Sequence, residues 1–306
     1  MNEHFLQSEM WKKFQIGLGR KNISRREKSF SYETFVEIGR FSRRLYCPYG
    51  PTLRSKEGLS EATTSLIADA KRTGVDFVRI EPQGMVPEKD LKKLGFYRAP
   101  REANPSHTVV NDVSGGHEVI DRHVSQSVRR YARKAEQAGL EYSVSYDPDH
   151  IEFFIDMIHD VAGRTGMRPR DDSYFILLAR ELFPEKAAGL FLAELDGKKV
   201  ATILFFCDGD TVCYAHAASY QEYRSLSPAT GLGLFALHQA YNMGCKAFDW
   251  YGVAPEGAGS SHSWTGFTQF KMGFGGERIN RCGTWELPIR KSRYRIYRLL
   301  TFLARE

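Results

Sequence analysis

Apolar positions in the first half of the chain alternate between helical and strand spacing. Residues 59–74 carry apolar side chains at helical spacing and end in a glycine, and the apolar run 75–82 that follows predicts a buried strand. Residues 124–139 predict a second helix with a basic face, followed by a strand over 141–146. This alternation is typical of a chain that mixes helices with a sheet.

The second half shows the same spacing more clearly. Residues 188–219 predict three antiparallel strands, joined by Asp-Gly hairpin turns at 196–197 and 208–209. Residues 227–244 then predict a helix, and residues 245–253 predict another buried strand. The order of elements is that of an acyltransferase-type α+β domain, and the first half resembles a degenerate copy of it.

The composition of the chain limits the classes of protein to which it can belong. A hydrophobic content of 42% supports a real core, and 306 residues favour two domains over one. The net charge of +6 favours polyanionic partners such as tRNA, nucleotide-linked substrates or anionic lipid surfaces. The five cysteines are scattered without metal-site spacing, so we expect reduced thiols, no metal and a cytoplasmic location. No continuous apolar stretch is long enough to span a membrane, so we expect a soluble protein.

Seven short stretches occur along the chain in the order of a known family. They are "FLQSEMW" near the N-terminus, "CPYGP" (47–51), "HTVVNDVS" (107–114), "VRRYARKAEQAGLE" (128–141), "YAHAASYQEYRSLSP" (214–228), "CKAFDWYGV" (245–253) and "FTQFKMGFGGE" (267–277). Together they resemble the FemABX family of peptidyltransferases, which add amino acids from aminoacyl-tRNA to the peptide of a peptidoglycan precursor in cell-wall synthesis.

The resemblance implies a fold and a cellular location. It implies two tandem GNAT (acyl-CoA N-acyltransferase-like) domains, the first over 1–141 with 286–306 returning to it, and the second over 142–285. The long helical arm of some relatives has no counterpart, because no extended heptad run occurs. We expect a monomer that works in the cytoplasm or at the inner face of the membrane.

The implied reaction needs neither a covalent nucleophile nor a cofactor. Aminoacyl-tRNA is an activated ester, so the enzyme must position an amine, remove a proton and stabilise an oxyanion. Phe270 and Lys271 match the family's "FK" position, where the lysine is regarded as supporting the transition state. The structural alternative is a strand lysine that extends its ammonium to water. Glycines 273, 275 and 276 could let the chain bend close to a substrate.

The resemblance also implies acceptor-binding positions. Arg170 and Tyr174 fall at such positions, and arginine suits a diphosphate-bearing acceptor, although a solvated basic loop is equally compatible. A lysine after the N-terminal tryptophan serves the same phosphates in the family, and Lys13 is our choice, with Gln15 as the alternative in an uncertain register. His216 stands where the family usually has a tyrosine, and it can equally be a core histidine.

The general base is the least determined part of the site. Glu81 ends the strand 75–82 and matches a position where relatives carry an acidic residue, so we assign it to proton transfer. Carboxylates at strand ends also cap helices or pair with arginines. Substrate-assisted proton removal remains open.

Three features support other interpretations. Gly231 and Gly233 begin a predicted helix, where acetyltransferases of this fold bind the pyrophosphate of coenzyme A, so acyl-CoA-dependent acylation of a small amine is the second hypothesis. In such acetyltransferases a Gln or Arg three residues before the first glycine helps to bind the pyrophosphate, and this chain has Pro228 at that position. The basic helix 128–141 would suit a non-catalytic RNA-binding module. The basic and apolar segment 290–306 predicts either a helix packed on a domain or contact with anionic lipid.

Overall fold

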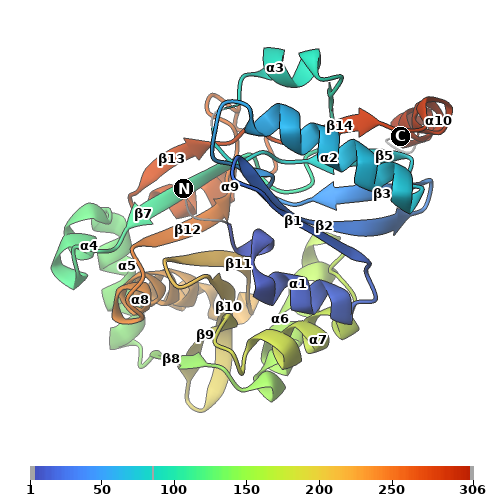
Figure 1. Ribbon diagram of the computed structural model, residues 1–306. Helices are drawn as coiled ribbons and strands as arrows, with labels where there is room; N and C mark the ends of the chain where they lie inside the picture. Colours follow the sequence, from blue (N-terminus) through green and yellow to red (C-terminus); the bar gives the residue numbers. More distant parts are fainter. Residues whose placement is uncertain (1–3, 85, 304–306) are drawn as a thin grey trace. The chain divides into compact units, whose positions relative to one another are not determined.

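The computed structural model describes residues 4–84 and 86–303, which form two compact units (Figure 1). Unit 1 comprises residues 1–106 and 280–306, and unit 2 comprises residues 107–279. The boundaries differ from the expected 141/142 and 285/286. The reason is that residues 107–112 form a strand of the second sheet, which draws the helices that follow it into unit 2.

Unit 1 contains a mixed sheet with the strand order β1-β2-β3-β5-β14-β6, and β4 pairs with β2. Its only parallel pair among the described residues is β3 with β5. The strands are β1 (Asn22–Arg26), β2 (Phe30–Gly39), β3 (Ser42–Cys47), β4 (Thr52–Leu53), β5 (Phe77–Ile80), β6 (Tyr97–Arg98) and β14 (Trp285–Pro288).

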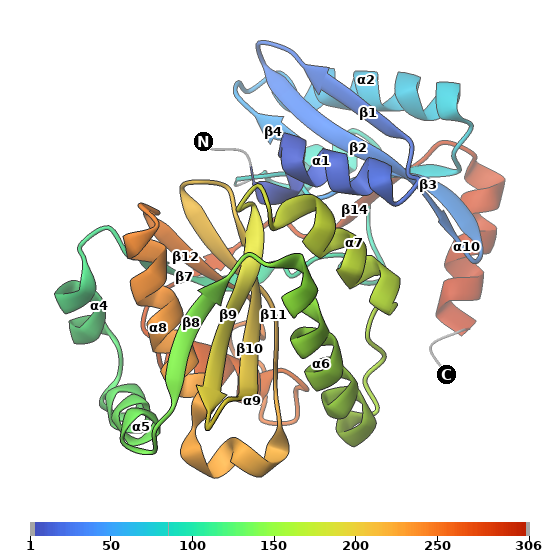
Figure 2. The ribbon, with the colours of Figure 1, turned by 90° about the horizontal axis from the view of Figure 1, so that it is seen from below.

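The helices of unit 1 are η1 (Phe5–Gln7), α1 (Glu9–Gly17), α2 (Gly58–Thr73), α3 (Glu88–Lys93) and α10 (Lys291–Leu303). Figure 2 shows α2 lying along β1 and β2, and its buried face packs on the sheet. Gly74 takes the left-handed conformation that ends α2, as the sequence predicts.

The segment that returns to unit 1 is held by both its strand and its helix. β14 pairs with β5 and β6, and Tyr297 of α10 stacks on Phe77 with ring centroids 4.8 Å apart. The buried Glu286 accepts hydrogen bonds from Tyr294 and Tyr297, at 2.9 and 3.2 Å, and pairs with Arg79. One face of α10 is therefore packed on a domain, while other apolar side chains of this helix are exposed: Ile296, Leu299, Phe302 and Leu303.

Unit 2 contains a seven-stranded sheet with the order β13-β7-β12-β11-β10-β9-β8. β8 to β11 form an antiparallel meander, and the two predicted Asp-Gly turns join β9, β10 and β11. The strands are β7 (His107–Asp112), β8 (Glu141–Ser145), β9 (Ala188–Leu195), β10 (Lys198–Cys207), β11 (Thr211–Ser219), β12 (Ala247–Gly252) and β13 (Glu277–Asn280).

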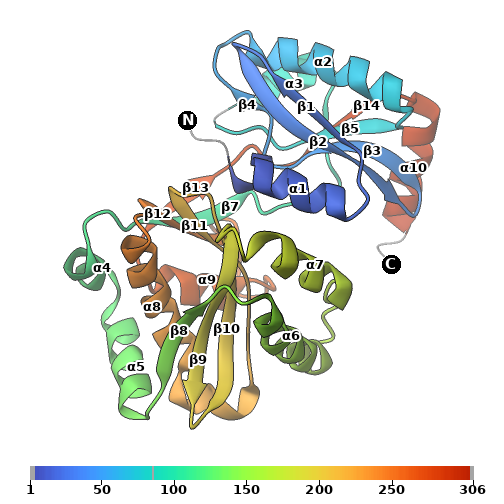
Figure 3. The ribbon, with the colours of Figure 1, turned by 60° about the horizontal axis from the view of Figure 1, so that its bottom comes forward.

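Helices cover both faces of this second sheet. Figure 3 shows α5 and α8 on one face and α6 and α7 on the other. The helices are α4 (His117–His123), α5 (Gln126–Gln137), η2 (Pro148–His150), α6 (Ile151–Thr165), α7 (Asp172–Leu182), η3 (Gln221–Leu226), α8 (Pro228–Asn242) and α9 (Thr265–Met272).

The two units repeat one topology. In each, an antiparallel meander leads through a helix, α2 or α8, to a strand that pairs in parallel with the last meander strand. That strand is then flanked by an antiparallel strand from a distant part of the chain, β14 in unit 1 and β7 in unit 2. The predicted α+β architecture of two related domains is confirmed.

The described helices are short. The longest of them, α2, has 16 residues, so the described chain contains no long helical arm. None of the described helices has the length and apolar character needed to cross a bilayer.

Candidate functional site

The parallel pair β11 and β12 separates soon after it begins. Only Thr211–Cys213 pair with Ala247–Asp249, although β11 continues to Ser219 and β12 to Gly252. Each strand also carries a register shift, near Ala215 in β11 and between Asp249 and Gly252 in β12. Such irregularities bend strands and redirect side chains. The carboxyl ends of the two strands therefore diverge, and side chains from elsewhere in unit 2 can reach between them.

Lys271 contacts both diverging strands. It lies in the last turn of α9, and only 8% of its surface is exposed. Its ammonium Nζ donates a hydrogen bond to the carbonyl oxygen of Gly252 on β12 at 2.8 Å. The same Nζ lies 5.1 Å from the centre of the Tyr214 ring on β11. Lys271 is thus a buried helix residue, and the alternative of a strand lysine that extends its ammonium to water is wrong.

The ammonium is an incompletely paired charge. A protonated lysine has three N–H donors, and among the described residues Gly252 supplies its one hydrogen-bond acceptor. Burial lowers the pKa of Lys271 from 10.5 to about 8, opposed by the negative charge of Asp249. Lys271 is therefore mostly protonated at neutral pH, with donors available to an oxyanion.

Asp249 shapes the backbone that Lys271 contacts. Its buried carboxylate accepts hydrogen bonds from the amide of Tyr251, at 2.7 Å, and from the hydroxyl of Thr108 on β7. Thr108 also donates to the carbonyl oxygen of Tyr251 at 2.8 Å. Tyr251 has a φ of 59°, a conformation that costs free energy for a residue with a side chain. The Asp249–Thr108 pair holds this bend, which precedes the carbonyl of Gly252.

Phe270 belongs to an aromatic cluster at the base of the site. Its ring packs edge-on against Trp250 at 6.2 Å and Phe274 at 5.1 Å, and it remains partly exposed. The structure therefore places Phe270 beside Lys271, with its ring anchored in the core of unit 2.

Three predicted acceptor-binding residues lie together in unit 2. The guanidinium of Arg170 lies 4.7 Å from the centre of the Tyr174 ring. His216 on β11 packs edge-on against Phe175, with ring centroids 5.7 Å apart. Burial, and to a lesser extent the charge of Arg170, lowers the pKa of His216 to about 4. His216 is therefore neutral at pH 7, while the exposed Arg170 supplies the positive charge of the cluster.

Glu81 has a structural environment. It is buried in unit 1, and its carboxylate accepts five hydrogen bonds between 2.7 and 3.1 Å. The donors are the hydroxyls of Tyr46 and Thr284, the amide of Tyr49, and the backbone and side-chain amides of Asn104. Both carboxylate oxygens are therefore occupied by donors of the protein itself. The geometry favours Glu81 as a cross-link between loops of unit 1 over Glu81 as the base.

Lys13 lies on the exposed side of α1 in unit 1. Its neighbour Lys12 pairs with Glu9 at 3.0 Å. The alternative residue Gln15 is buried, and it accepts a hydrogen bond from Arg20 at 2.5 Å. Of these three positions, Lys13 is the most accessible to a phosphate, and its role stays a prediction.

The glycine-rich segments serve packing. Both Gly231 and Gly233 lie on the buried face of α8. A Cβ atom at Gly231 would overlap the hydroxyl of Tyr142, and one at Gly233 would lie 2.6 Å from the ring of Phe274. Close helix packing thus explains the glycines that suggested a coenzyme A cradle.

Gly275 and Gly276 also face protein. Both have positive φ angles, and a Cβ atom would lie 2.8 Å from the carbonyl oxygen of His123 or 2.7 Å from that of Val110, respectively. These glycines let the chain pass close to neighbouring backbone, and the expectation that they make room for a substrate is not supported.

Sequence reasoning missed several partners of Lys271. Tyr214, Asp249 and Gly252 were not selected, because their proximity depends on strand divergence and on two register shifts. Regular strand alternation would have placed Tyr214 with His216 instead. Two stretches, "YAH" and "FDWYG", lie within the segments that resemble the family. They indicated the strands but not the geometry of the strands.

The fold is similar to the folds of several solved structures. The structure is similar to the crystal structure of FemX, with a TM-score of 0.84 and 17% sequence identity. The similarity covers 96% of this chain and 94% of the FemX chain. It is also similar to L-PGS from Bacillus licheniformis (TM-score 0.59, 11% identity, 99% and 95% covered). A tandem GNAT protein from the clavulanic acid biosynthesis pathway follows at a TM-score of 0.54 and 12% identity, with 86% and 81% covered.

A family model matches part of the second half of the sequence. The model of the FemAB family matches residues 196–301, a stretch that includes β10 to β12, α9 and Lys271. The matched stretch is about a third of the chain, and the similarity to FemX extends over nearly all of it as a similarity of fold. Comparison with curated proteins finds no match.

Proposed function

We propose that this protein transfers the aminoacyl group of an aminoacyl-tRNA to an amine of a peptidoglycan precursor peptide. The observation that carries the proposal is the buried ammonium of Lys271, held between two diverging strands inside the segment that matches the FemAB family. A fixed cation with unpaired donors in a desolvated setting suits a reaction that develops negative charge on oxygen.

The reaction requires few groups from the protein. The amine nitrogen of the acceptor attacks the ester carbonyl carbon, which forms the C–N bond and places negative charge on the carbonyl oxygen. Lys271 donates a hydrogen bond to this oxygen. Collapse of the intermediate breaks the ester C–O bond, and the departing ribose oxygen takes up the proton that the amine loses. Orientation of the two substrates supplies most of the remaining rate enhancement.

The acceptor is proposed to contact the cluster of Arg170, Tyr174 and His216. The exposed guanidinium of Arg170 can form paired hydrogen bonds to a phosphate of a nucleotide-linked or lipid-linked precursor. Tyr174 holds this guanidinium against its ring. The neutral His216 would act through hydrogen bonding, because it carries no charge near pH 7.

An acyl-CoA donor is less compatible with this site. The space beside Gly231 and Gly233 is filled by Tyr142 and Phe274, so packing accounts for both glycines without a pyrophosphate. Pro228 at the first turn of α8 removes one backbone donor as well. The fold alone does not identify the donor, because one fold can host several functions.

The identity of the donor is tested by comparing two labelled substrates in separate incubations. The protein is incubated with a muropeptide acceptor and either labelled aminoacyl-tRNA or labelled acetyl-CoA, and the peptide product is separated by mass. We expect product from the tRNA donor alone. Product from acetyl-CoA without product from any aminoacyl-tRNA would overturn the proposal in favour of the acyl-CoA hypothesis.

A further inference from the structure

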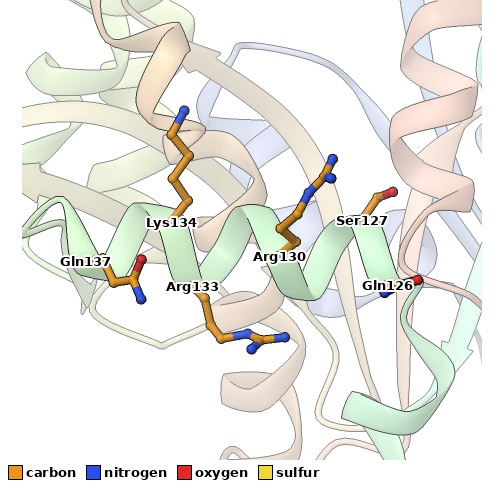
Figure 4. Close-up of a pocket in the computed structure, with 6 residues that line it drawn as sticks. All are labelled: Gln126, Ser127, Arg130, Arg133, Lys134 and Gln137. Atoms are coloured by element: carbon orange, nitrogen blue, oxygen red, sulfur yellow. The ribbon is translucent and has the colours of Figure 1, made fainter.

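Helix α5 presents an entirely polar and basic face to the solvent. Six exposed side chains share this face and surround an open hollow of about 550 Å³ (Figure 4). They are Gln126, Ser127, Arg130, Arg133, Lys134 and Gln137. The opposite face of α5 buries Val128, Ala132 and Ala135 in the core of unit 2. This segregation leaves three cations on one face of a single helix.

The three cations lack acidic partners. Within the described residues, no carboxylate forms an ion pair with Arg130, Arg133 or Lys134. Lys134 donates to the carbonyl oxygen of Ser225 at 2.7 Å, and Arg130 lies over the ring of Tyr131, 4.8 Å from its centre. Like charges three and four residues apart on a helix repel each other, which costs stability. A bound polyanion would remove this repulsion.

The position of α5 connects this face to the lysine site. Ser125, the N-terminal cap of α5, donates its backbone amide to the carbonyl oxygen of Gly273 at 2.9 Å. Gly273 directly follows α9, which carries Lys271. The first turn of α5 thus begins beside the helix of the reacting lysine, and the helix extends from there for about 18 Å. A nucleic-acid strand bound along α5 can have one end directed towards Lys271.

We infer that the outer face of α5 binds the phosphate backbone of the tRNA whose aminoacyl end reaches Lys271. This inference rests on the proposed function for the identity of the RNA. Arginine and lysine with amide and hydroxyl neighbours are the groups that contact nucleic-acid phosphates. A lipid surface fits less well, because helices that lie on membranes insert apolar side chains, and the six side chains of this face are all polar.

The test uses the triple variant R130Q/R133Q/K134Q. Glutamine retains helix propensity and removes the charge, so the fold should persist and circular dichroism can verify it. The matched control is K89Q/K92Q/K93Q, which removes three equally exposed cations from α3 in unit 1. The binding probe is a synthetic RNA hairpin of acceptor-stem length that ends in single-stranded CCA, measured by anisotropy across a salt series.

We expect the α5 variant to bind the hairpin about tenfold or more weakly, and the slope of log K against log salt to flatten by about one unit per lost phosphate contact. In turnover assays, its KM should rise for full aminoacyl-tRNA but not for an aminoacylated CCA trinucleotide, which is too short to reach along α5. The α3 control should match the native protein in both measurements.

Other outcomes separate this inference from the proposed function. Native-like hairpin binding by the α5 variant overturns the inference while leaving aminoacyl transfer intact. Loss of binding to vesicles with anionic headgroups, with unchanged RNA binding, also overturns it and assigns the face to a membrane. Salt-dependent RNA binding through α5 without any aminoacyl transfer supports α5 as an RNA-binding surface and overturns the proposed function.

Discussion

Tyr214 and His216 are two residues apart on β11, yet they face opposite sides of the sheet in unit 2. Tyr214 packs against Trp250 and lies beneath the ammonium of Lys271, whereas His216 packs against Phe154 and Phe175 of α6 and α7. The register shift explains this, because Ala215 is an extra residue relative to β10. One strand thereby contributes to both the lysine site and the acceptor cluster.

The aromatic ring of Tyr214 should stabilise the charge of Lys271. Replacing Tyr214 with Leu removes the cation–π contact, which contributes about 0.5–2 kcal/mol. We expect Y214L to lower the pKa of Lys271 and to reduce kcat at neutral pH. The conservative variant Y214F keeps the ring and should keep the rate. Equal losses in both variants would assign the effect to the hydroxyl instead.

Removal of the Lys271 charge should slow the chemical step. Lys271→Met keeps much of the side-chain volume, and the loss of one oxyanion donor typically lowers kcat by about 10²–10³. Single-turnover kinetics with saturating substrates measure this step directly. An unchanged rate in a correctly folded K271M protein would exclude Lys271 from the reaction.

The pH dependence distinguishes an ammonium from a general base. The pKa of Lys271 is lowered to about 8 by burial, so the charged form predominates below pH 8. If the ammonium stabilises the oxyanion, kcat should fall as pH rises through about 8. A general base would give the opposite slope.

The same shift in pKa affects stability with a defined sign. Between about pH 8 and 10.5 the unfolded chain holds a proton on Lys271 that the folded chain has lost. The contribution of Lys271 to the free energy of unfolding should therefore increase with pH across this window. K271M should lack that contribution, which denaturant titrations at pH 7.5 and 10 can measure.

Asp249 should raise the pKa of Lys271 without touching the substrate. D249N retains the shape of the side chain but removes the negative charge that raises the pKa of Lys271. We expect the descending limb of the pH–rate profile to move to lower pH. T108V removes a hydrogen bond to Asp249 but no charge, so the pH–rate profile of this variant should match that of the native protein. A shift of the pH–rate profile in both variants would indicate that each one displaces the backbone near Tyr251.

Glu81 should matter for stability and not for the reaction. Its carboxylate accepts five hydrogen bonds, so E81Q turns an N–H toward donors and should cost at least about 2 kcal/mol of unfolding free energy. The rate per folded molecule should remain native. E88Q, at an exposed carboxylate of α3, should leave the free energy of unfolding nearly unchanged. A specific loss of kcat in folded E81Q would restore Glu81 as the base.

Local patterns were sufficient for most elements of the fold. The hairpins of β9 to β11 were predictable because Asp-Gly turns separate strands of regular alternation, and α2 was predictable from its spacing and terminal glycine. The assignment of β7 to unit 2 was not, because its partner β12 lies more than a hundred residues away. The helix α9 was missed because aromatic and glycine residues mask its short periodicity.

The site was predictable only in part. A resemblance could mark Lys271 and Phe270, because adjacent residues remain adjacent in any fold. It could not show that the Asp249 network sets the bend at Tyr251, since that depends on pairing between β7 and β12.

The place of β14 in the first sheet has a consequence for synthesis of the chain. Because β14 lies between β5 and β6, the sheet of unit 1 stays incomplete until residues 285–288 have left the ribosome. Unit 2 is continuous from 107 to 279 and can complete its sheet earlier, apart from the edge strand β13. The second domain in sequence is therefore expected to be the first to fold, and the N-terminal domain waits for the last tenth of the chain.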